Sequence, residues 1–332
     1  MQSTGETSTR VVVAVLTYRR PRDLAEVLPA LRAQAAAVRP PARVLVVDND
    51  PDAGAAAAVA ALAATPGAEL GHVHEPRPGI AAARNRALAE AAADDLLVFV
   101  DDDERPAPGW LAHLLDLHAR TGAAGVVGPV VSRFEGPLDP WIADGRFFER
   151  RRLPTGTPVA VAATNNLLLD LRQVRAAGVG FDERFGLSGG SDTLFTRALV
   201  AAGLRILWCD EALVTDVVPA ARATRDWVLR RALRSGNGWS RTSLELRPGL
   251  AARVRLSAAG AVRAGAGAGA LLAGALVRRR PWRARGARTL ARGLGMVGGA
   301  WGWTYVEYAR PAARSATRAA AGRPPTSAAA RR

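Results

Sequence analysis

Apolar runs and helical apolar patterns alternate along the first hundred residues of the chain. Four short apolar runs predict strands, at residues 11–16, 44–47, 70–74 and 96–100. The segments between them predict helices. In the first of these, Pro21 suits the first helical turn and Leu24, Val27, Leu28 and Leu31 recur at helical spacing. Four repetitions of strand and helix predict an α/β fold with a mostly parallel sheet and helices on both faces.

Polar side chains follow three of the predicted strands. Asp101, Asp102 and Asp103 come directly after residues 96–100, while Thr17 with Arg19, and Asp48 with Asp50, follow two earlier strands. Ligands bind at this edge of open α/β sheets, and three adjacent carboxylates stay ionised in a cleft only beside a cation. Mg²⁺ or Mn²⁺ together with a phosphate is one candidate, and a solvated acidic turn is the alternative. For Asp48 the alternative is a role in the turn itself.

The turn after the first predicted strand excludes two common nucleotide sites. Residues 17–21 read TYRRP and contain no glycine, whereas a dinucleotide-binding turn needs glycines for close approach to the pyrophosphate. A P-loop is also missing. A nucleoside diphosphate fits the polar residues better, since carboxylates accept hydrogen bonds from base and ribose while arginine and metal bind phosphate.

Seven segments together resemble the family-2 glycosyltransferases, which have the GT-A fold. They are TYRRP at 17–21, VVDN at 46–49, GIAAARN at 79–85, FVDDD at 99–103, TNNLLL at 164–169, FDERF at 181–185 and GGSD at 189–192. The resemblance covers roughly residues 10–240. It implies an inverting transferase that uses a nucleotide sugar (UDP- or dTDP-type) and a divalent metal, Mg²⁺ or Mn²⁺.

The resemblance also implies roles for the donor-side residues. Thr17, Arg19, Asp48 and Asp50 would line the base and ribose, and Arg84 would lie near the phosphates. Asp101 to Asp103 stand at the DxD motif, where Asp103 would bind the metal with Asp101 nearby, and Asp102 would face the ribose or a metal-bound water. Many relatives complete the metal shell with a His, where this chain offers Asp216.

On the acceptor side, the resemblance makes Asp192 the general base that takes the proton from the acceptor hydroxyl. The alternative is that Ser191 or Asp192 only caps the following helix. Asn165 and Asn166 would face the transferred sugar or form a turn. Residues 132–158 are predicted to be an irregular loop in which Trp141 contacts the acceptor or packs on the sheet. Arg231 and Arg234, three apart on a basic helix capped by Thr224 and predicted to end at Gly236, would bind phosphate or form a basic surface.

Charge divides the chain into two parts. Residues 1–220 hold 22 Arg and 27 acids, a net charge of −5, and residues 221–332 hold 23 Arg and 3 acids, a net charge of +20. The acidic body gives no reason to expect nucleic acid, whereas the basic part suits an anionic membrane surface. Cys209 is the only cysteine in the sequence, which excludes a disulfide within the chain.

Two apolar segments lie in the basic part, at residues 264–277 and 294–308. We expect both to be short interfacial helices, because 14 apolar residues are too few to span a bilayer. Packing on the catalytic domain is the alternative.

The predicted organisation is a disordered start (1–9), a GT-A domain (10–245, with a nucleotide-sugar half at 10–104 and an acceptor half at 105–245), a basic helical membrane-associating region (246–310) and a disordered tail (311–332). We expect a glycan or lipid-linked acceptor and a location at the cytoplasmic face of the cell membrane. A sugar nucleotidyltransferase, which needs a glycine-rich triphosphate loop near residue 20, and a non-catalytic binding protein that uses the basic region are the alternatives.

Overall fold

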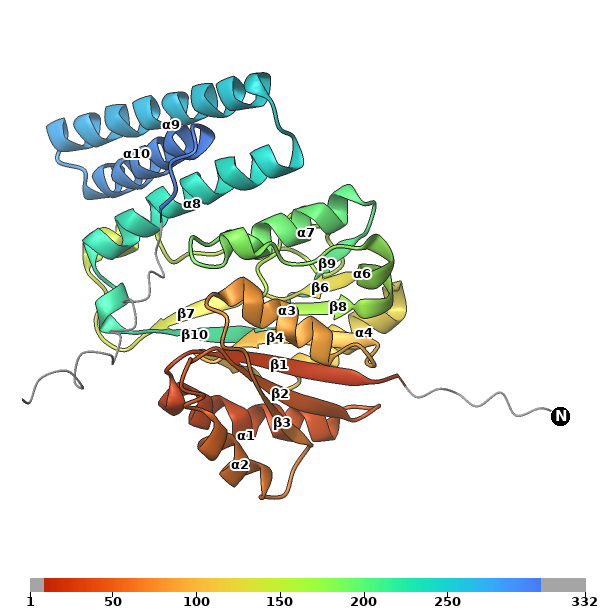
Figure 1. Cartoon of the computed structure of the whole chain (residues 1–332). Helices are drawn as coiled ribbons and strands as arrows, with labels where there is room; N and C mark the ends of the chain where they lie inside the picture. Colours follow the sequence, from red (N-terminus) through yellow and green to blue (C-terminus); the bar gives the residue numbers. More distant parts are fainter. Residues whose placement is uncertain (1–8, 306–332) are drawn as a thin grey trace, which may run out of the picture.

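A seven-stranded sheet forms the centre of the fold (Figure 1). The computed structural model describes residues 9–305. Within that range the sheet has the strand order β3-β2-β1-β4-β8-β6-β9. Its strands are β1 (Val11–Thr17), β2 (Ala42–Asp48), β3 (Leu70–His74), β4 (Leu96–Asp101), β6 (Gly125–Val127), β8 (Asn166–Asp170) and β9 (Ile206–Trp208). The first four are parallel and confirm the sequence prediction, while β8 runs antiparallel to both β4 and β6.

Helices cover both faces of this sheet, as the alternation of strand and helix predicts. They are α1 (Pro21–Ala37), α2 (Ala56–Ala63), α3 (Ile80–Glu90), α4 (Trp110–Thr121), α6 (Leu171–Ala177) and α7 (Ser191–Ala201). Val11, Val13 and Val15 of β1 pack into one core with α1, α2 and α4, while Val12 and Ala14 pack into a second core with α3, α6 and α7. The strand is apolar throughout because both of its faces are buried.

A smaller sheet of three strands stands beside the edge where β4 ends. Its order is β5-β10-β7, formed by β5 (Glu104–Pro106), β10 (Val214–Val218) and β7 (Val130–Phe134). The prediction of an irregular segment at 132–158 was partly wrong, because the segment begins inside β7 and contains α5 (Pro140–Asp144). The Asp139 side chain caps α5, whose five residues are too few to show a helical period.

Three long helices form the C-terminal part: α8 (Arg225–Leu246), α9 (Leu250–Leu276) and α10 (Arg280–Ala300). In Figure 1 they lie together beyond α7, away from β1 to β3. Thr224 caps α8 as predicted, since its side chain accepts a hydrogen bond from the Trp227 backbone N–H. The predicted end at Gly236 was wrong. A Cβ at Gly236 would lie 2.0 Å from the Arg292 carbonyl oxygen, so this glycine permits close packing of α8 on α10.

The same close packing joins α9 to α10. Gly260, Gly267 and Gly274 recur every seventh residue along α9, and a Cβ at any of them would lie within 2.9 Å of α10 atoms or of the turn before α10. Glycine is unfavourable inside a helix by about 1 kcal/mol, but here it allows backbone to approach backbone. The expectation of two short helices was therefore wrong. By length and composition alone, the 27 residues of α9 are long and apolar enough to cross a membrane, and 17% of its most apolar window is buried in the protein.

The predicted domain boundaries and disordered ends stay predictions. Leu246, where α8 ends, lies at the predicted domain boundary, but α8 itself packs with α10. Residues 1–8 and 306–332 lie outside the described residues. They include most of the predicted disordered start, the end of the second apolar segment and the whole predicted disordered tail.

Candidate active site

A cavity of about 860 Å³ opens where β1 and β4 end. Its walls come from the ends of these two strands, the starts of α3 and α7, and one side of α8. Eight of the predicted site residues line it, namely Thr17, Arg84, Asp101, Asp102, Asp103, Asp192, Arg231 and Arg234. Residues separated by as much as 217 positions in the sequence thus meet in one cavity, in agreement with the predicted edge of the sheet.

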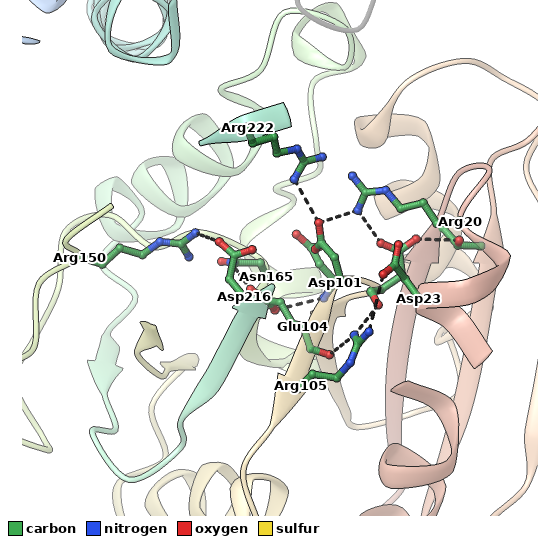
Figure 2. A network of polar contacts seen from close by, with 12 residues as sticks. Arg20, Asp23, Asp101, Glu104, Arg105, Arg150, Asn165, Asp216 and Arg222 are labelled. Carbon is green, nitrogen blue, oxygen red and sulfur yellow. Dashed lines mark hydrogen bonds and ion pairs between the residues drawn. The ribbon is translucent and has the colours of Figure 1, made fainter. Parts of the chain in front are cut away.

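Two arginines bind the acidic turn after β4. Arg20 donates from Nη1 to Asp102 Oδ1 at 2.8 Å and to Asp103 Oδ2 at 2.7 Å. Arg222 donates to the same Asp103 oxygen at 3.2 Å. The Thr17 hydroxyl donates to Asp102 Oδ2 at 2.8 Å. Figure 2 shows Arg20 and Arg222 approaching the turn that follows Asp101 from separate parts of the chain.

Burial and mutual repulsion shape the electrostatics of this turn. Burial, together with repulsion from Asp103 and Asp102, raises the pKa of Asp101 to about 7. Burial also raises the pKa of Asp102 to about 6, although Arg20 acts in the opposite direction. The pKa of Glu104, which is 1% exposed, is raised well above its usual value by burial and by Asp101. Arg20 therefore opposes the effect of burial on the pKa values of Asp101 and Asp102 without cancelling it.

The three predicted metal ligands do not form one group, because Asp101 and Asp103 line the cavity and Asp216 does not. Across residues 9–305, no three His, Cys, Asp or Glu side chains are grouped so that they could hold a metal ion. Asp216 lies on β10, outside the cavity lining, and its Oδ2 accepts a 2.7 Å hydrogen bond from Arg150. Figure 2 shows this pair beside the acidic turn. Antiparallel pairing places Asp216 opposite Glu104, so it extends the polar network behind the turn.

Three residues predicted for the base and ribose do not line the cavity. Asp48 is 1% exposed and accepts hydrogen bonds from the backbone N–H groups of Asp50 at 2.9 Å and Ala55 at 2.8 Å. This is the turn role that the sequence left open for Asp48. Arg19 has a positive φ of 55° and pairs with Asp50 at 3.1 Å, away from the cavity. The neighbouring residues Tyr18 and Asn49 line the cavity instead.

Asp192 lies in the first turn of α7 and lines the cavity, as Arg84 does. Neither Ser191 nor Asp192 caps the helix: Gly190 occupies the cap position with a positive φ of 99°. Ser191 instead accepts a 2.7 Å hydrogen bond from Arg84 Nη1. The Asp192 carboxylate accepts a 2.7 Å hydrogen bond from the backbone N–H of Thr193. It lines the same cavity as the acidic turn, as a base acting on a bound hydroxyl requires.

Asn165 and Asn166 support the site and do not line it. Asn166 is fully buried; its side chain accepts from Trp110 Nε1 at 2.8 Å and donates to the carbonyl oxygens of Pro129 and Ala212. Contact between Asn166 and a sugar is therefore ruled out by its burial inside the sheet. Asn165 donates to Glu104. The sequence alone could not assign these roles, because the partners of both side chains come from distant segments of the chain.

Trp141 also lies outside the cavity. Its ring stacks on Phe147 at 5.2 Å, and Arg225 lies 5.3 Å from the ring centre. These contacts join Trp141 to its own segment and to α8, so they match neither acceptor contact nor the packing on the sheet that the sequence left open. Arg20, Arg222 and Arg292 also line the cavity and were not predicted from the sequence. Arg20 lies inside the TYRRP segment, but with 45 arginines in the chain the sequence holds no signal that singles out one of them.

Comparisons with known proteins agree with this geometry. Residues 12–169 match the model of the family described as glycosyl transferase family 2. The chain is 36% identical over 250 residues to the succinoglycan biosynthesis protein ExoM of Rhizobium meliloti (strain 1021), covering 75% of this chain and 80% of that protein. It is 33% identical over 175 residues to a pre-mycofactocin glycosyltransferase of Mycobacterium tuberculosis, and the match covers 51% of this chain and 35% of that protein.

A solved structure of similar fold is a mannosyltransferase from Pyrobaculum calidifontis in complex with GDP-Man and Mn²⁺. It has a TM-score of 0.61 and 22% identity, with 89% of this chain and 88% of that chain covered. TarS of S. aureus has a TM-score of 0.50 and 16% identity, and the match covers 74% of this chain and 47% of the TarS chain.

Proposed function

Because the chain belongs to glycosyl transferase family 2 and is a glycosyltransferase with the GT-A fold, we propose that it transfers a sugar from a nucleoside diphosphate sugar to an acceptor hydroxyl with inversion. One observation carries the proposal: the acidic turn of β4 and Asp192 of α7 line a single cavity together with arginines. The turn serves the leaving diphosphate and Asp192 serves the incoming alcohol.

The donor side of the cavity combines acids with guanidinium groups. Arg84, Arg231 and Arg234 suit the negative charge of a diphosphate, and Thr17 with Asp102 suits the ribose. The related fold of the archaeal mannosyltransferase, which holds GDP-Man and Mn²⁺, supports a nucleotide sugar as donor. A UDP- or dTDP-sugar is the donor type we propose.

The residues of the acidic turn fit a hard divalent cation, Mg²⁺ or Mn²⁺. Their donor atoms are all oxygens, and burial together with mutual repulsion raises the pKa values of Asp101 and Asp102, so a bound cation would stabilise their ionised forms. Asp103, bound by Arg20 and Arg222, is the residue we assign to the metal, with Asp101 beside it. A bound cation would neutralise charge on the departing diphosphate. Arg20 and Arg222 would release Asp103 when the donor enters.

On the acceptor side, Asp192 takes the proton as the hydroxyl oxygen attacks the sugar carbon from the face opposite the diphosphate. A neutral alcohol is a weak nucleophile, so the carboxylate must act as bonding begins. One displacement therefore inverts the configuration of the anomeric carbon. The similarity to a succinoglycan biosynthesis protein supports a glycan or lipid-linked acceptor in polysaccharide or glycoconjugate synthesis.

We assign the reaction to the cytoplasmic face of the cell membrane. Large apolar side chains of the C-terminal helices are exposed, including Leu276 at 86%, Trp282 at 49% and Trp301 at 59%. Arginines surround them and would attract anionic lipid. Vesicle flotation with and without phosphatidylglycerol measures this association, and a protein that ignores anionic vesicles would refute the membrane assignment alone.

The decisive experiment is a screen of nucleotide sugars for donor hydrolysis with Mn²⁺, Mg²⁺ or EDTA. We expect one donor to be cleaved with metal, and Asp103→Ala and Asp192→Ala each to lose at least about 100-fold in rate. Asp52→Ala, an exposed acid outside the cavity, is the matched control. Intact donors in every condition, or variants as active as the parent, would refute the proposal. A nucleotidyltransferase would instead consume a nucleoside triphosphate in the same screen.

A further inference from the structure

A second cavity, of about 590 Å³, lies between α7, α8 and α9. Four arginines line it, namely Arg197, Arg247, Arg255 and Arg263, and its lining within the described chain includes no acidic side chain. The rest of the wall is mostly apolar, with Leu246, Leu256 and Met296 among its residues. Four cations facing apolar surface without a carboxylate suit an anion that carries a hydrocarbon group.

Trp239 of α8 lines both this cavity and the catalytic one. Arg197 lies 4.5 Å from the centre of the Trp239 ring and donates to Thr242 Oγ1 at 3.2 Å and Ser243 Oγ at 3.0 Å. These neutral partners hold the guanidinium in place without neutralising it. Trp239 therefore forms part of the wall of both cavities and makes them neighbours.

The arginines of the two cavities also repel one another. The pKa of Arg197 is lowered by burial and by Arg247, and the pKa of Arg292 in the catalytic cavity is lowered by burial and by Arg263. An anion between these groups would relieve both repulsions. The excess of positive charge therefore continues from the catalytic cavity to α9.

We propose that the second cavity binds the phosphate group of an amphiphilic molecule, whose hydrocarbon chain lies along α9. Ala252, Leu256 and Ala259 of α9 line the cavity and give the hydrocarbon chain an apolar surface along the helix. The inference rests on the proposed function in one respect: this amphiphile is the acceptor, and its hydroxyl end reaches Asp192 past Trp239.

Calorimetric titration of the full chain with farnesyl phosphate, below its micelle concentration, tests the proposal. Inorganic phosphate and farnesol are the two reference probes. We expect farnesyl phosphate to bind at least about tenfold more tightly than either. Equal binding of inorganic phosphate would overturn the amphiphile, since the cavity would then be a free phosphate site. Equal binding of farnesol would overturn the phosphate contact.

Two double variants test where farnesyl phosphate binds. The double variant Arg255→Ser with Arg263→Ser removes two exposed arginines of the cavity and is expected to weaken farnesyl phosphate binding at least about tenfold. The double variant Arg278→Ser with Arg283→Ser removes the same charge from exposed positions outside both cavities. It is expected to bind like the parent. Equal losses in both double variants would overturn the assigned site, because only net charge would then matter.

A further pair of variants separates this proposal from failure of folding and of the proposed reaction. Ala259→Leu fills the cavity from α9 without changing charge, and it too is expected to weaken binding. Asp103→Asn acts on the donor site and is expected to bind farnesyl phosphate like the parent. Donor hydrolysis without farnesyl phosphate binding would overturn the second site and leave the glycosyltransferase mechanism in place.

Discussion

Replacing Asp101 by asparagine is expected to stabilise the fold at neutral pH. The pKa of Asp101 is raised from an ordinary value of 3.8 to about 7 by burial and by its acidic neighbours. Between these two pH values the folded protein holds a proton that the unfolded chain releases. The free energy of unfolding of the parent therefore falls as pH rises from about 4 to about 7.

The size of the effect follows from the shift. A difference of about 3 pKa units at about 1.4 kcal/mol per unit is about 4 kcal/mol for a single carboxylate. Asp101 is only partly buried, so we expect Asp101→Asn to gain about 2 to 4 kcal/mol at pH 8. The gain should shrink to below about 1 kcal/mol at pH 4, where the folded carboxyl is protonated and the unfolded one is only about half ionised.

Urea unfolding followed by circular dichroism at pH 4 to 8, in EDTA and without donor, measures this difference. Asp170→Asn is the matched control. The pKa of Asp170, which caps α6, is lowered: burial opposes the shift, but hydrogen bonds from Gln173 exceed it. That variant should lose stability at pH 7 and match its parent at acid pH. A gain for Asp101→Asn that is absent, or equal at every pH, would refute the electrostatic reasoning.

Three further outcomes follow from the same contacts. Gly267→Ala is expected to destabilise the α9–α10 pair by about 1 to 3 kcal/mol, because its Cβ would lie 2.3 Å from a backbone nitrogen. Gly269→Ala, whose Cβ would meet nothing within 4 Å, should be neutral or stabilising. Thermal unfolding followed by circular dichroism measures both glycine variants. Asn166→Ala leaves two carbonyl oxygens and an indole N–H without their partner, and should cost about 2 to 4 kcal/mol in urea unfolding. Arg20→Gln removes a cation that competes for Asp103, so Mn²⁺ alone should bind more tightly by calorimetry; unchanged Mn²⁺ affinity would contradict that competition.

The two halves of the chain use glycine in different ways. In the catalytic half, Gly190 takes a positive φ that starts α7 and turns Asp192 toward the cavity. In the C-terminal helices, Gly236 and Gly267 are ordinary helical residues whose missing side chains admit another backbone. The first use creates the site, and the second brings α8 and α10 close enough for Arg292 to reach the same cavity.

The sequence by itself determined the parallel half of the sheet, its flanking helices and the position of the acidic turn. These follow from local patterns: a strand buried on both faces must be apolar throughout, and the helix after it must show an apolar stripe. The ends of such strands meet at one edge, so Thr17 and Asp102 were predictable as members of one site. Asp192 was predicted only from the resemblance to the family.

Only the tertiary structure decided which polar residues face the cavity and which support it. Asp48, Asn166 and Asp216 carry the same chemistry as their neighbours, but each is bound to nearby backbone or to an arginine. The choice depends on contacts between segments far apart in the chain, and no local pattern records those contacts. Arg222 and the glycine packing of α9 were hidden for the same reason, because their partners come from other elements.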